Sequence, residues 1–165
     1  MHDESNPFYS YQPIGTIHSA FTDVAGMPIQ PNGARGVQGT IDLVPDFCEG
    51  LSDLDGFSRI FLLYALHRSS GYSLTVTPFL DPIPRGVFAT RSPKRPNAIG
   101  LSIVRLTGID KCKLSIEDVD VVDGTPLLDI KPYVPEFDAY PGERCGWLSA
   151  VAHKAKHTRS DDRFR

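Results

Sequence analysis

The sequence predicts a small all-β domain, either a barrel or a sandwich, on three observations. The chain has 165 residues, of which 41% are hydrophobic, enough for one packed core but too few for two full domains. Its 14 glycines and 14 prolines are spread along the chain and divide it into short segments. Within these segments apolar residues alternate with polar ones or run briefly, which is typical of short strands.

Eight segments have this pattern. They are residues 14–19, 39–44, 59–67, 72–79, 86–89, 101–109, 113–122 and 127–130. Helix is expected only in two short stretches, at 45–54, where Pro45 suits the first helical position, and at 147–156. The dipeptide Asp123-Gly124 predicts a hairpin turn.

Charge, cysteine content and hydropathy limit the class of protein. Seventeen Lys and Arg against 20 Asp and Glu give a net charge of −3, so any RNA contact must come from a local basic patch. Cys48, Cys112 and Cys145 are odd in number and widely spaced, which predicts neither a disulfide framework nor a zinc site. No apolar run reaches the roughly 18 residues of a membrane span, so we expect a soluble, cytoplasmic protein in a reducing compartment.

The expected organisation has three parts. Residues 1–12 form a polar N-terminal extension, residues 13–150 form the β domain, and residues 151–165 form a basic, mobile tail. We find no internal repeat. The chain has no G-x-S-x-G elbow, Walker loop or H-E-x-x-H motif, and its glycines at 33, 36 and 39 precede a strand, which disfavours a Rossmann enzyme.

The stretch 86–102 is the most unusual part of the sequence. Pro93 and Pro96 restrict the backbone of its central loop. The loop carries Arg91, Lys94, Arg95 and Asn97. A stiff cationic loop can hold an anion or the carboxylate of a cofactor at little entropic cost, although an ordinary solvated loop is the alternative.

An acid-rich stretch begins within the seventh predicted strand and continues beyond it. It contains Asp118, Asp120, Asp123 and Asp129. These carboxylates could contribute to a site, or Asp118 and Asp120 could simply border a strand end. Asp129 or Lys131 could serve as an acid or base, but such a pair is more often a surface ion pair.

Three histidines were considered as site residues. His67 ends an apolar strand, where a site residue is common, yet the pattern alone favours a satisfied core histidine. His153 and His157 have a spacing that permits metal binding on a helix, but no acidic or thiol ligand accompanies them. We therefore expect no metal site.

Several motifs together resemble the TrmO-type (YaeB-like) family of S-adenosylmethionine-dependent tRNA methyltransferases. The motifs are Ile14-Gly15, residues 19–21 (SAF), 28–31 (PIQP), 56–58 (GFS) leading to His67, 88–102 (FATRSPKRPNAIGLS) and 123–133 (DGTPLLDIKPY). They occur in order between about residues 13 and 135. The resemblance implies a small β-barrel with short helices that forms a homodimer.

The resemblance also implies the activity and its site. Members methylate threonylcarbamoyladenosine, the modified adenosine next to the tRNA anticodon. The implied S-adenosylmethionine contacts fall on Pro28, Ile29, Gln30, His67, Arg68, Arg91, Leu101, Glu117, Asp118, Val119 and Asp120. We assign the substrate side to Lys94, Arg95, Asn97, Lys131 and Tyr133. No catalytic base can be chosen from the sequence.

The sequence departs from the family pattern at Ile29, where members carry arginine, and at Ala20 and Ala98, where they carry proline. The loss of an arginine removes a charge from the cofactor or RNA side. Two alternatives to the tRNA enzyme were weighed: a methyltransferase of a small molecule that uses the same cofactor, and a non-catalytic module that binds S-adenosylmethionine.

Overall fold

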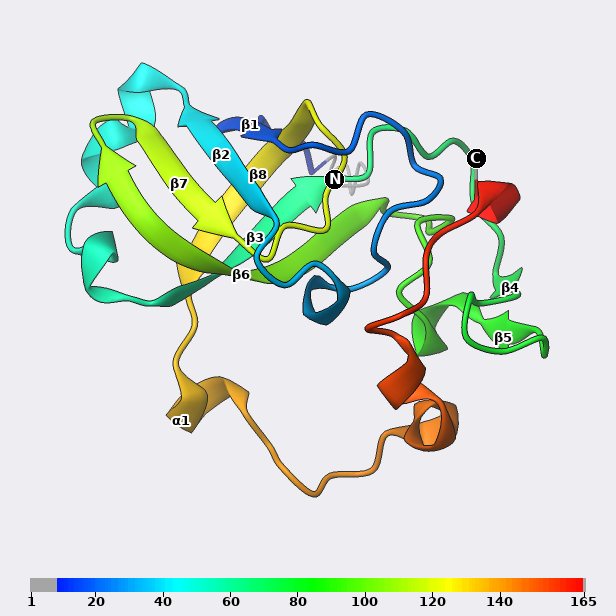
Figure 1. The fold of residues 1–165 in the computed structure, drawn as a ribbon. Coiled ribbons are helices and arrows are strands. Elements are labelled where there is room, and N and C mark those ends of the chain that lie inside the picture. Colours follow the sequence, from blue (N-terminus) through cyan, green and yellow to red (C-terminus); the bar gives the residue numbers. More distant parts are fainter. Residues whose placement is uncertain (1–8, 165) are drawn as a thin grey trace, which may run out of the picture.

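Six antiparallel strands close a barrel in the computed structural model of the chain, which describes residues 9–164 (Figure 1). The strands are β1 Gly15–His18, β2 Gln38–Leu43, β3 Arg59–Ala65, β6 Ile99–Asp110, β7 Lys113–Glu117 and β8 Thr125–Pro132. Their order around the barrel is β1-β2-β7-β6-β3-β8, and β8 pairs with β1 to close it. The predicted all-β barrel is confirmed.

Alternating side chains fill the inside of the barrel. Along β3, Ile60, Leu62 and Tyr64 point inward and are buried, whereas the residues between them are half-buried. The same two-residue period places Val104 and Leu106 of β6 inside. A barrel this small holds a packed core rather than a channel.

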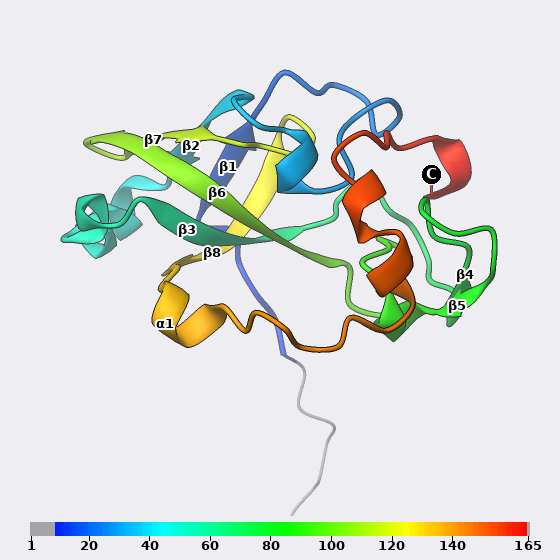
Figure 2. The same cartoon turned by 60° about the horizontal axis from the view of Figure 1, so that its bottom comes forward.

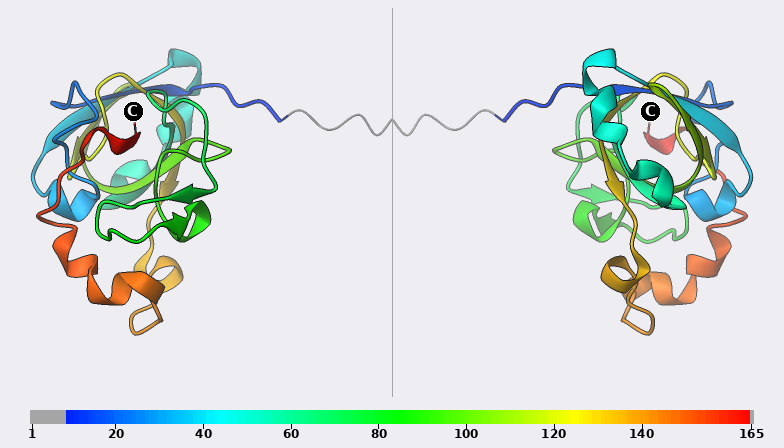
Figure 3. Two further views of the ribbon diagram at one scale, coloured as in Figure 1. Left: turned by 90° about the vertical axis from the view of Figure 1, so that its right-hand side faces the viewer. Right: turned by 90° about the vertical axis from the view of Figure 1, so that its left-hand side faces the viewer.

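The topology gathers three long loops at one end of the barrel. These loops join β1 to β2 (residues 19–37), β3 to β6 (66–98) and β7 to β8 (118–124). The opposite end carries the loop between β2 and β3 and the tight β6–β7 turn. The three motifs with unusual chemistry, at 28–31, 88–102 and 118–123, therefore meet at the same end, which faces the viewer in the left view of Figure 3.

Three predicted strands are shorter than expected. In place of strand 72–79 there is only β4 Thr75–Val76, paired with β5 Arg85–Gly86, and the 3₁₀ turn η4 Val87–Ala89 replaces most of strand 86–89. Prolines at 78, 82 and 84 leave few backbone donors for a longer ladder. β7 ends at Glu117 because Asp118 takes a left-handed conformation, with φ of 66°.

The turn at Asp123-Gly124 is real, but the hairpin prediction is wrong. Gly124 has φ of 77°, yet β7 pairs with β2 and β6 while β8 pairs with β1 and β3. The Gly124 N–H donates to the carbonyl of Ile17. Asp123 instead holds the end of β1, because its Oδ1 accepts a hydrogen bond from the Ser19 N–H at 3.1 Å.

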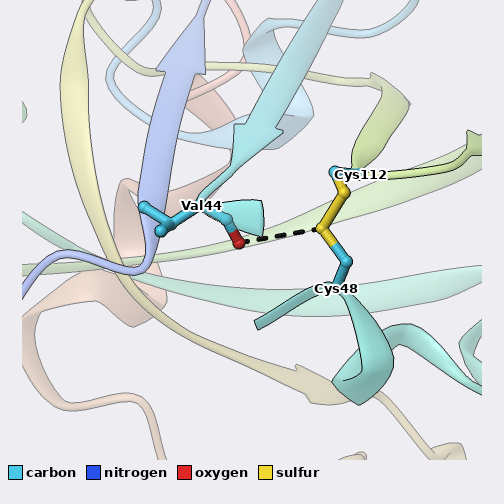
Figure 4. Close-up of a disulfide and its surroundings, with 3 residues drawn as sticks. All are labelled: Val44, Cys48 and Cys112. Atoms are coloured by element: carbon cyan, nitrogen blue, oxygen red, sulfur yellow. Dashed lines mark hydrogen bonds between the residues drawn. A yellow bond between two sulfur atoms is a disulfide. The ribbon is translucent and has the colours of Figure 1, made fainter. Parts of the chain in front are cut away.

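A disulfide joins Cys48 and Cys112, which corrects the expectation of unpaired cysteines (Figure 4). Cys48 lies in the 3₁₀ turn η2 Pro45–Leu51, and Cys112 lies in the β6–β7 turn, 64 residues later. Their spacing in sequence is uninformative because only the barrel brings the two segments together. Cys145 is free and exposed.

The remaining helical elements are short. They are η1 Pro31–Gly33, η3 Leu54–Gly56, α1 Pro135–Asp138, η5 Gly146–Ala150, η6 Ala152–Lys154 and η7 Asp162–Phe164. The two predicted helices, at 45–54 and 147–156, are thus successive 3₁₀ turns. Within residues 9–164 no helix is long and apolar enough to cross a membrane.

The C-terminal segment packs against the three-loop end, where we had expected a mobile tail. From α1 it runs past the barrel to the side of β4 and β5 (Figure 2). Ala155 is buried, and the Ser160 side chain donates to the carbonyl of Val24 at 2.6 Å. The expected N-terminal extension, 1–12, lies for the most part outside the described residues.

Candidate active site

A cleft of about 1570 Å³ lies between the three-loop end of the barrel and the C-terminal segment. Each of the three loops contributes to its lining: Gln30 from the first, Arg91 from the second and Asp120 from the third. The cleft also passes over Leu101, an exposed residue on the outer side of β6. The barrel topology thus brings the two predicted stretches, the Arg91 loop and the acidic run, to one place.

A chain of hydrogen bonds connects the barrel interior to this cleft. The Tyr64 hydroxyl on β3 lies 2.9 Å from Ser102 Oγ on β6, and Ser102 Oγ donates to Asp120 Oδ1 at 2.6 Å. Ser102 is only 2% exposed, so it is a polar residue at an inward position of an otherwise apolar strand. The network holds the Asp120 carboxylate in one orientation, as buried polar groups require.

The surroundings of Asp120 change its acidity. Burial raises the pKa of this carboxyl to about 6, against the opposing effects of the Ser102 hydrogen bond and the nearby Arg91 cation. Burial and the Asp120 charge likewise raise the pKa of Tyr64 well above its usual value, so the phenol stays protonated. A carboxyl group with a pKa near 6 can exchange a proton close to neutral pH.

Arg91 lines the same cleft as Asp120 and is held by a second loop. Its Nη1 donates to Gln30 Oε1 at 2.6 Å, which links the predicted loop 28–31 to the predicted loop 88–102. Arg95 stabilises the loop that carries Arg91, because Arg95 Nη1 donates hydrogen bonds to the carbonyls of Val87, Thr90 and Ser92. Arg95 therefore holds the loop in its shape, and its Nη1 is already used in these hydrogen bonds.

Gly100 is required by the position of the Tyr64 ring. A Cβ at residue 100 would lie 2.1 Å from Tyr64 Cε2, a distance that no side chain can accept. The Ile99-Gly100 pair of the sequence motif therefore allows the aromatic ring to pack over the backbone of β6 and to reach Ser102.

Asp118 has a structural role beside the cleft. Its Oδ2 accepts a hydrogen bond from Arg59 Nη2 at 2.9 Å, and its Oδ1 accepts one from the Gly36 N–H at 2.9 Å. Burial favours the neutral form, but these two hydrogen bonds and the Arg59 charge outweigh it and lower the pKa of Asp118. Asp118 thus fastens the first loop to the barrel, while Asp120, two residues later, faces the cleft.

The structure brings together most of the predicted site residues and separates others. Those that line the cleft are Pro28, Ile29, Gln30, His67, Arg68, Arg91, Leu101, Asp118, Asp120, Arg95 and Tyr133. Glu117 lies on β7 opposite Gln38 and Arg105, and the Val119 side chain is fully buried in the core. Lys94 Nζ donates to the carbonyl of Ser70, Asn97 is exposed outside the cleft, and Lys131 pairs with Asp129 at 2.8 Å.

His67 is exposed at the rim of the cleft, so the core reading favoured by its pattern is wrong. Strand β3 ends at Ala65, so His67 lies two residues beyond the strand. Its Nδ1 lies 3.4 Å from Thr125 Oγ1, and its Nε2 accepts a hydrogen bond from Arg68 Nε at 3.3 Å.

Sequence reasoning missed Tyr64, Ser102 and the C-terminal lining residue Trp147. Ser102 did carry a signal, since it is a polar residue at an inward position of an alternating strand. Tyr64 lies within an apolar run, and Trp147 comes close to the cleft only in three dimensions. Across residues 9–164 no three His, Cys, Asp or Glu side chains gather as a metal site would require.

Comparison with known proteins decides the family. Residues 16–139 match the model of the tRNA-methyltransferase O N-terminal domain, TrmO_N. The chain belongs to this family. A protein of Pyrococcus abyssi, named as a probable S-adenosyl-L-methionine-binding protein, is 50% identical over 93% of this chain and 84% of its own length.

Two bacterial TrmO relatives agree with this assignment. The tRNA (adenine(37)-N6)-methyltransferase of Escherichia coli (strain K12) is 34% identical over 87% of this chain and 65% of its own length. The crystal structure of TrmO from Pseudomonas aeruginosa superposes with a TM-score of 0.72 and 40% identity, over 86% of this chain and 63% of that chain. The chain thus spans just under two thirds of these bacterial proteins.

Proposed function

We propose that this chain is an S-adenosylmethionine-dependent methyltransferase that acts on threonylcarbamoyladenosine next to the tRNA anticodon. The observation that carries the proposal is the convergence of Arg91 and Asp120, which carry opposite charges, on one cleft of a TrmO-family barrel. The Escherichia coli relative is named as a tRNA (adenine(37)-N6)-methyltransferase, which supports the substrate.

The side chains of the cleft fit this cofactor by their chemistry. S-adenosylmethionine carries a sulfonium and an ammonium, which are cations, together with a carboxylate and an adenine. The half-buried Asp120 carboxylate favours a neighbouring cation, and the Arg91 guanidinium can bind a carboxylate through two hydrogen bonds. Pro28, Ile29 and Leu101 offer apolar surface for a ring.

When bound, the cofactor supplies an electrophilic methyl group. The residues of the chain have two tasks: to hold the acceptor nitrogen in line with that group, which is worth roughly 7–11 kcal/mol of the barrier, and to accept the proton that the nitrogen loses. Asp120 is suited to the second task, because its carboxylate is largely ionised above pH 6 and can take up one proton. Ser102 and Tyr64 keep Asp120 in place.

Calorimetric titration with S-adenosylmethionine tests the cofactor site. Arg91→Ala is expected to weaken binding at least tenfold, because a charge-assisted pair with the cofactor carboxylate contributes about 1.5–3 kcal/mol. Arg144→Ala is the matched control, since Arg144 is exposed and does not line the cleft. Wild-type affinity in Arg91→Ala would remove Arg91 from the site.

The assembly and location of the protein are also proposed: a homodimer in the cytoplasm, where the tRNA substrate supports the location although the Cys48–Cys112 disulfide is unusual for a reducing compartment. The family resemblance supports the dimer, and Phe88 and Leu101 present 76% and 48% of their surfaces to solvent beside the cleft. Such exposed apolar groups suit an interface with a second copy. Sedimentation equilibrium should give twice the chain mass; a mass of one chain at micromolar concentration would contradict the dimer.

A further inference from the structure

The strap, defined as residues 146–164, forms one wall of the cleft although it lies beyond the segment that matches the family model, residues 16–139. Its lining residues include Trp147, Leu148, Ala152, Ala155, Lys156 and His157. In Figure 2 the strap, drawn in orange to red, lies beyond the segment that leaves α1 and runs to the side of β4 and β5. None of the cofactor contacts that the family resemblance implies lies in the strap, so they do not explain its role.

The strap is fixed at two of the three loops that carry predicted cofactor residues. Trp147 Nε1 donates to the carbonyl of Ala89 at 2.8 Å, two residues before Arg91. Further along, Arg159 forms a β-bridge with Pro28, and the Ser160 N–H donates to the carbonyl of Met27 at 2.9 Å. These contacts hold the strap as an ordered wall rather than a loose tail.

The middle of the strap is strongly basic. Residues 152–159 (AHKAKHTR) contain Lys154, Lys156 and Arg159 with two histidines and no acidic residue. Lys156 is exposed and lines the cleft, as does Arg35 on the neighbouring first loop. A Cβ at Gly33 would lie 3.3 Å from the Lys156 carbonyl oxygen, so the two segments are in contact.

Among the described residues, neither Lys156 nor Arg35 forms a salt bridge. Arg59 and Arg163, which also lie along the strap side, are instead paired with Asp118 and Asp161. These unpaired cations at the rim of the cleft create a local positive potential on a chain whose net charge is −3. Cations spaced along a groove fit a polyanion better than one small carboxylate.

We propose that the strap is the RNA-binding wall of this enzyme, with Lys156 and Arg35 in contact with phosphates of the strand that enters the cleft. The proposal rests on the proposed function for the identity of the RNA. Phosphate contacts position a nucleic acid without reading its sequence. The strap would therefore place the target adenosine, while the cleft performs the chemistry.

Fluorescence anisotropy with a tRNA anticodon stem-loop, measured as a function of salt, tests this role. The double variant Lys156→Gln/Arg35→Gln is expected to reduce the slope of log K against log salt by ~2, about one unit for each cation lost. Lys111→Gln is the matched control, because Lys111 is an exposed lysine at the far end of the barrel. S-adenosylmethionine affinity, measured by calorimetry, should be unchanged in all variants.

The outcomes separate this inference from the proposed function. A wild-type slope and affinity in the double variant, or no binding of the stem-loop by the wild type, would overturn the RNA-binding wall. A reduced slope in a protein that transfers no methyl group would support the wall and contradict the methyltransferase. An equal loss in Lys111→Gln would show non-specific attraction and would also overturn the inference.

Discussion

Asp120→Asn is expected to lower the rate of methyl transfer at saturating S-adenosylmethionine by about 10²- to 10⁴-fold, the usual contribution of a general base. The amide keeps the shape of the side chain and can still bond to Ser102, but it cannot accept the proton of the acceptor nitrogen. Transfer of labelled methyl to tRNA measures the rate. Asp110→Asn, an exposed residue near the β6–β7 turn, is the control and should keep the wild-type rate.

The pH dependence distinguishes a base from a cofactor ligand. Asp120 loses its activity as a base when it is protonated, so the wild-type rate at saturating cofactor should fall tenfold per pH unit well below the pKa of Asp120 in the complex, which the cations of the cofactor lower from the value of about 6 in the free protein. The Asn variant should lack this dependence. A variant that keeps the wild-type saturated rate and loses only cofactor affinity would assign Asp120 to binding alone.

The same titration affects stability with the opposite sign. The pKa of Asp120 is raised in the folded state, so the folded protein binds the proton more tightly than the unfolded chain. The free energy of unfolding from this group therefore decreases as pH rises from about 4 to about 6. The ionised carboxylate needed for catalysis is the less stable form, as is common at active sites.

Removal of the Cys48–Cys112 disulfide has the second largest expected effect. The bridge closes a loop of 64 residues, and the chain-entropy relation gives about 4 kcal/mol of stabilisation for such a loop. Cys48→Ser/Cys112→Ser should therefore lower the midpoint of thermal unfolding by roughly 8–16 °C, as measured by scanning calorimetry.

Two comparisons control this experiment. Cys145→Ser should leave the midpoint unchanged, because Cys145 is free and exposed. Reduction of the wild type should reproduce the lower midpoint of the double variant. A double variant as stable as the wild type would show that the bridge adds nothing to the stability of the fold.

The local pattern of apolar and polar residues predicted the barrel strands well, because each strand has one side that faces the core and one that faces the outside of the barrel. The apolar run at 60–66 and the alternation at 101–106 mark β3 and β6 directly. The local pattern failed for 72–79 and 86–89, because these segments pair only with each other, over two residues, and Pro78, Pro82 and Pro84 lie in or between them. The closing pairs, β8 with β1 and β3, depend on the whole chain and leave no local signal.

The sequence predicted the site residues only where they lie in recognisable motifs. Arg91 and Asp120 stand in stretches whose chemistry is visible in the sequence, and both line the cleft. Nothing local distinguishes Asp118 from Asp120, because their roles are decided by Arg59 and Ser102, which lie on other strands. Residues 151–165 were expected to form a mobile tail because their anchors, such as the carbonyl of Met27 that accepts a hydrogen bond from the Ser160 N–H, are distant in sequence.

The most direct measurement is transfer of a labelled methyl group from S-adenosylmethionine to tRNA that carries threonylcarbamoyladenosine, followed by mass spectrometry of the separated nucleosides. We predict label in that nucleoside alone with the wild type and, at subsaturating S-adenosylmethionine, at least tenfold less label with Arg91→Ala. If the wild type binds S-adenosylmethionine but leaves tRNA unlabelled, the proposed function is contradicted, and a small-molecule acceptor or a purely binding role takes its place.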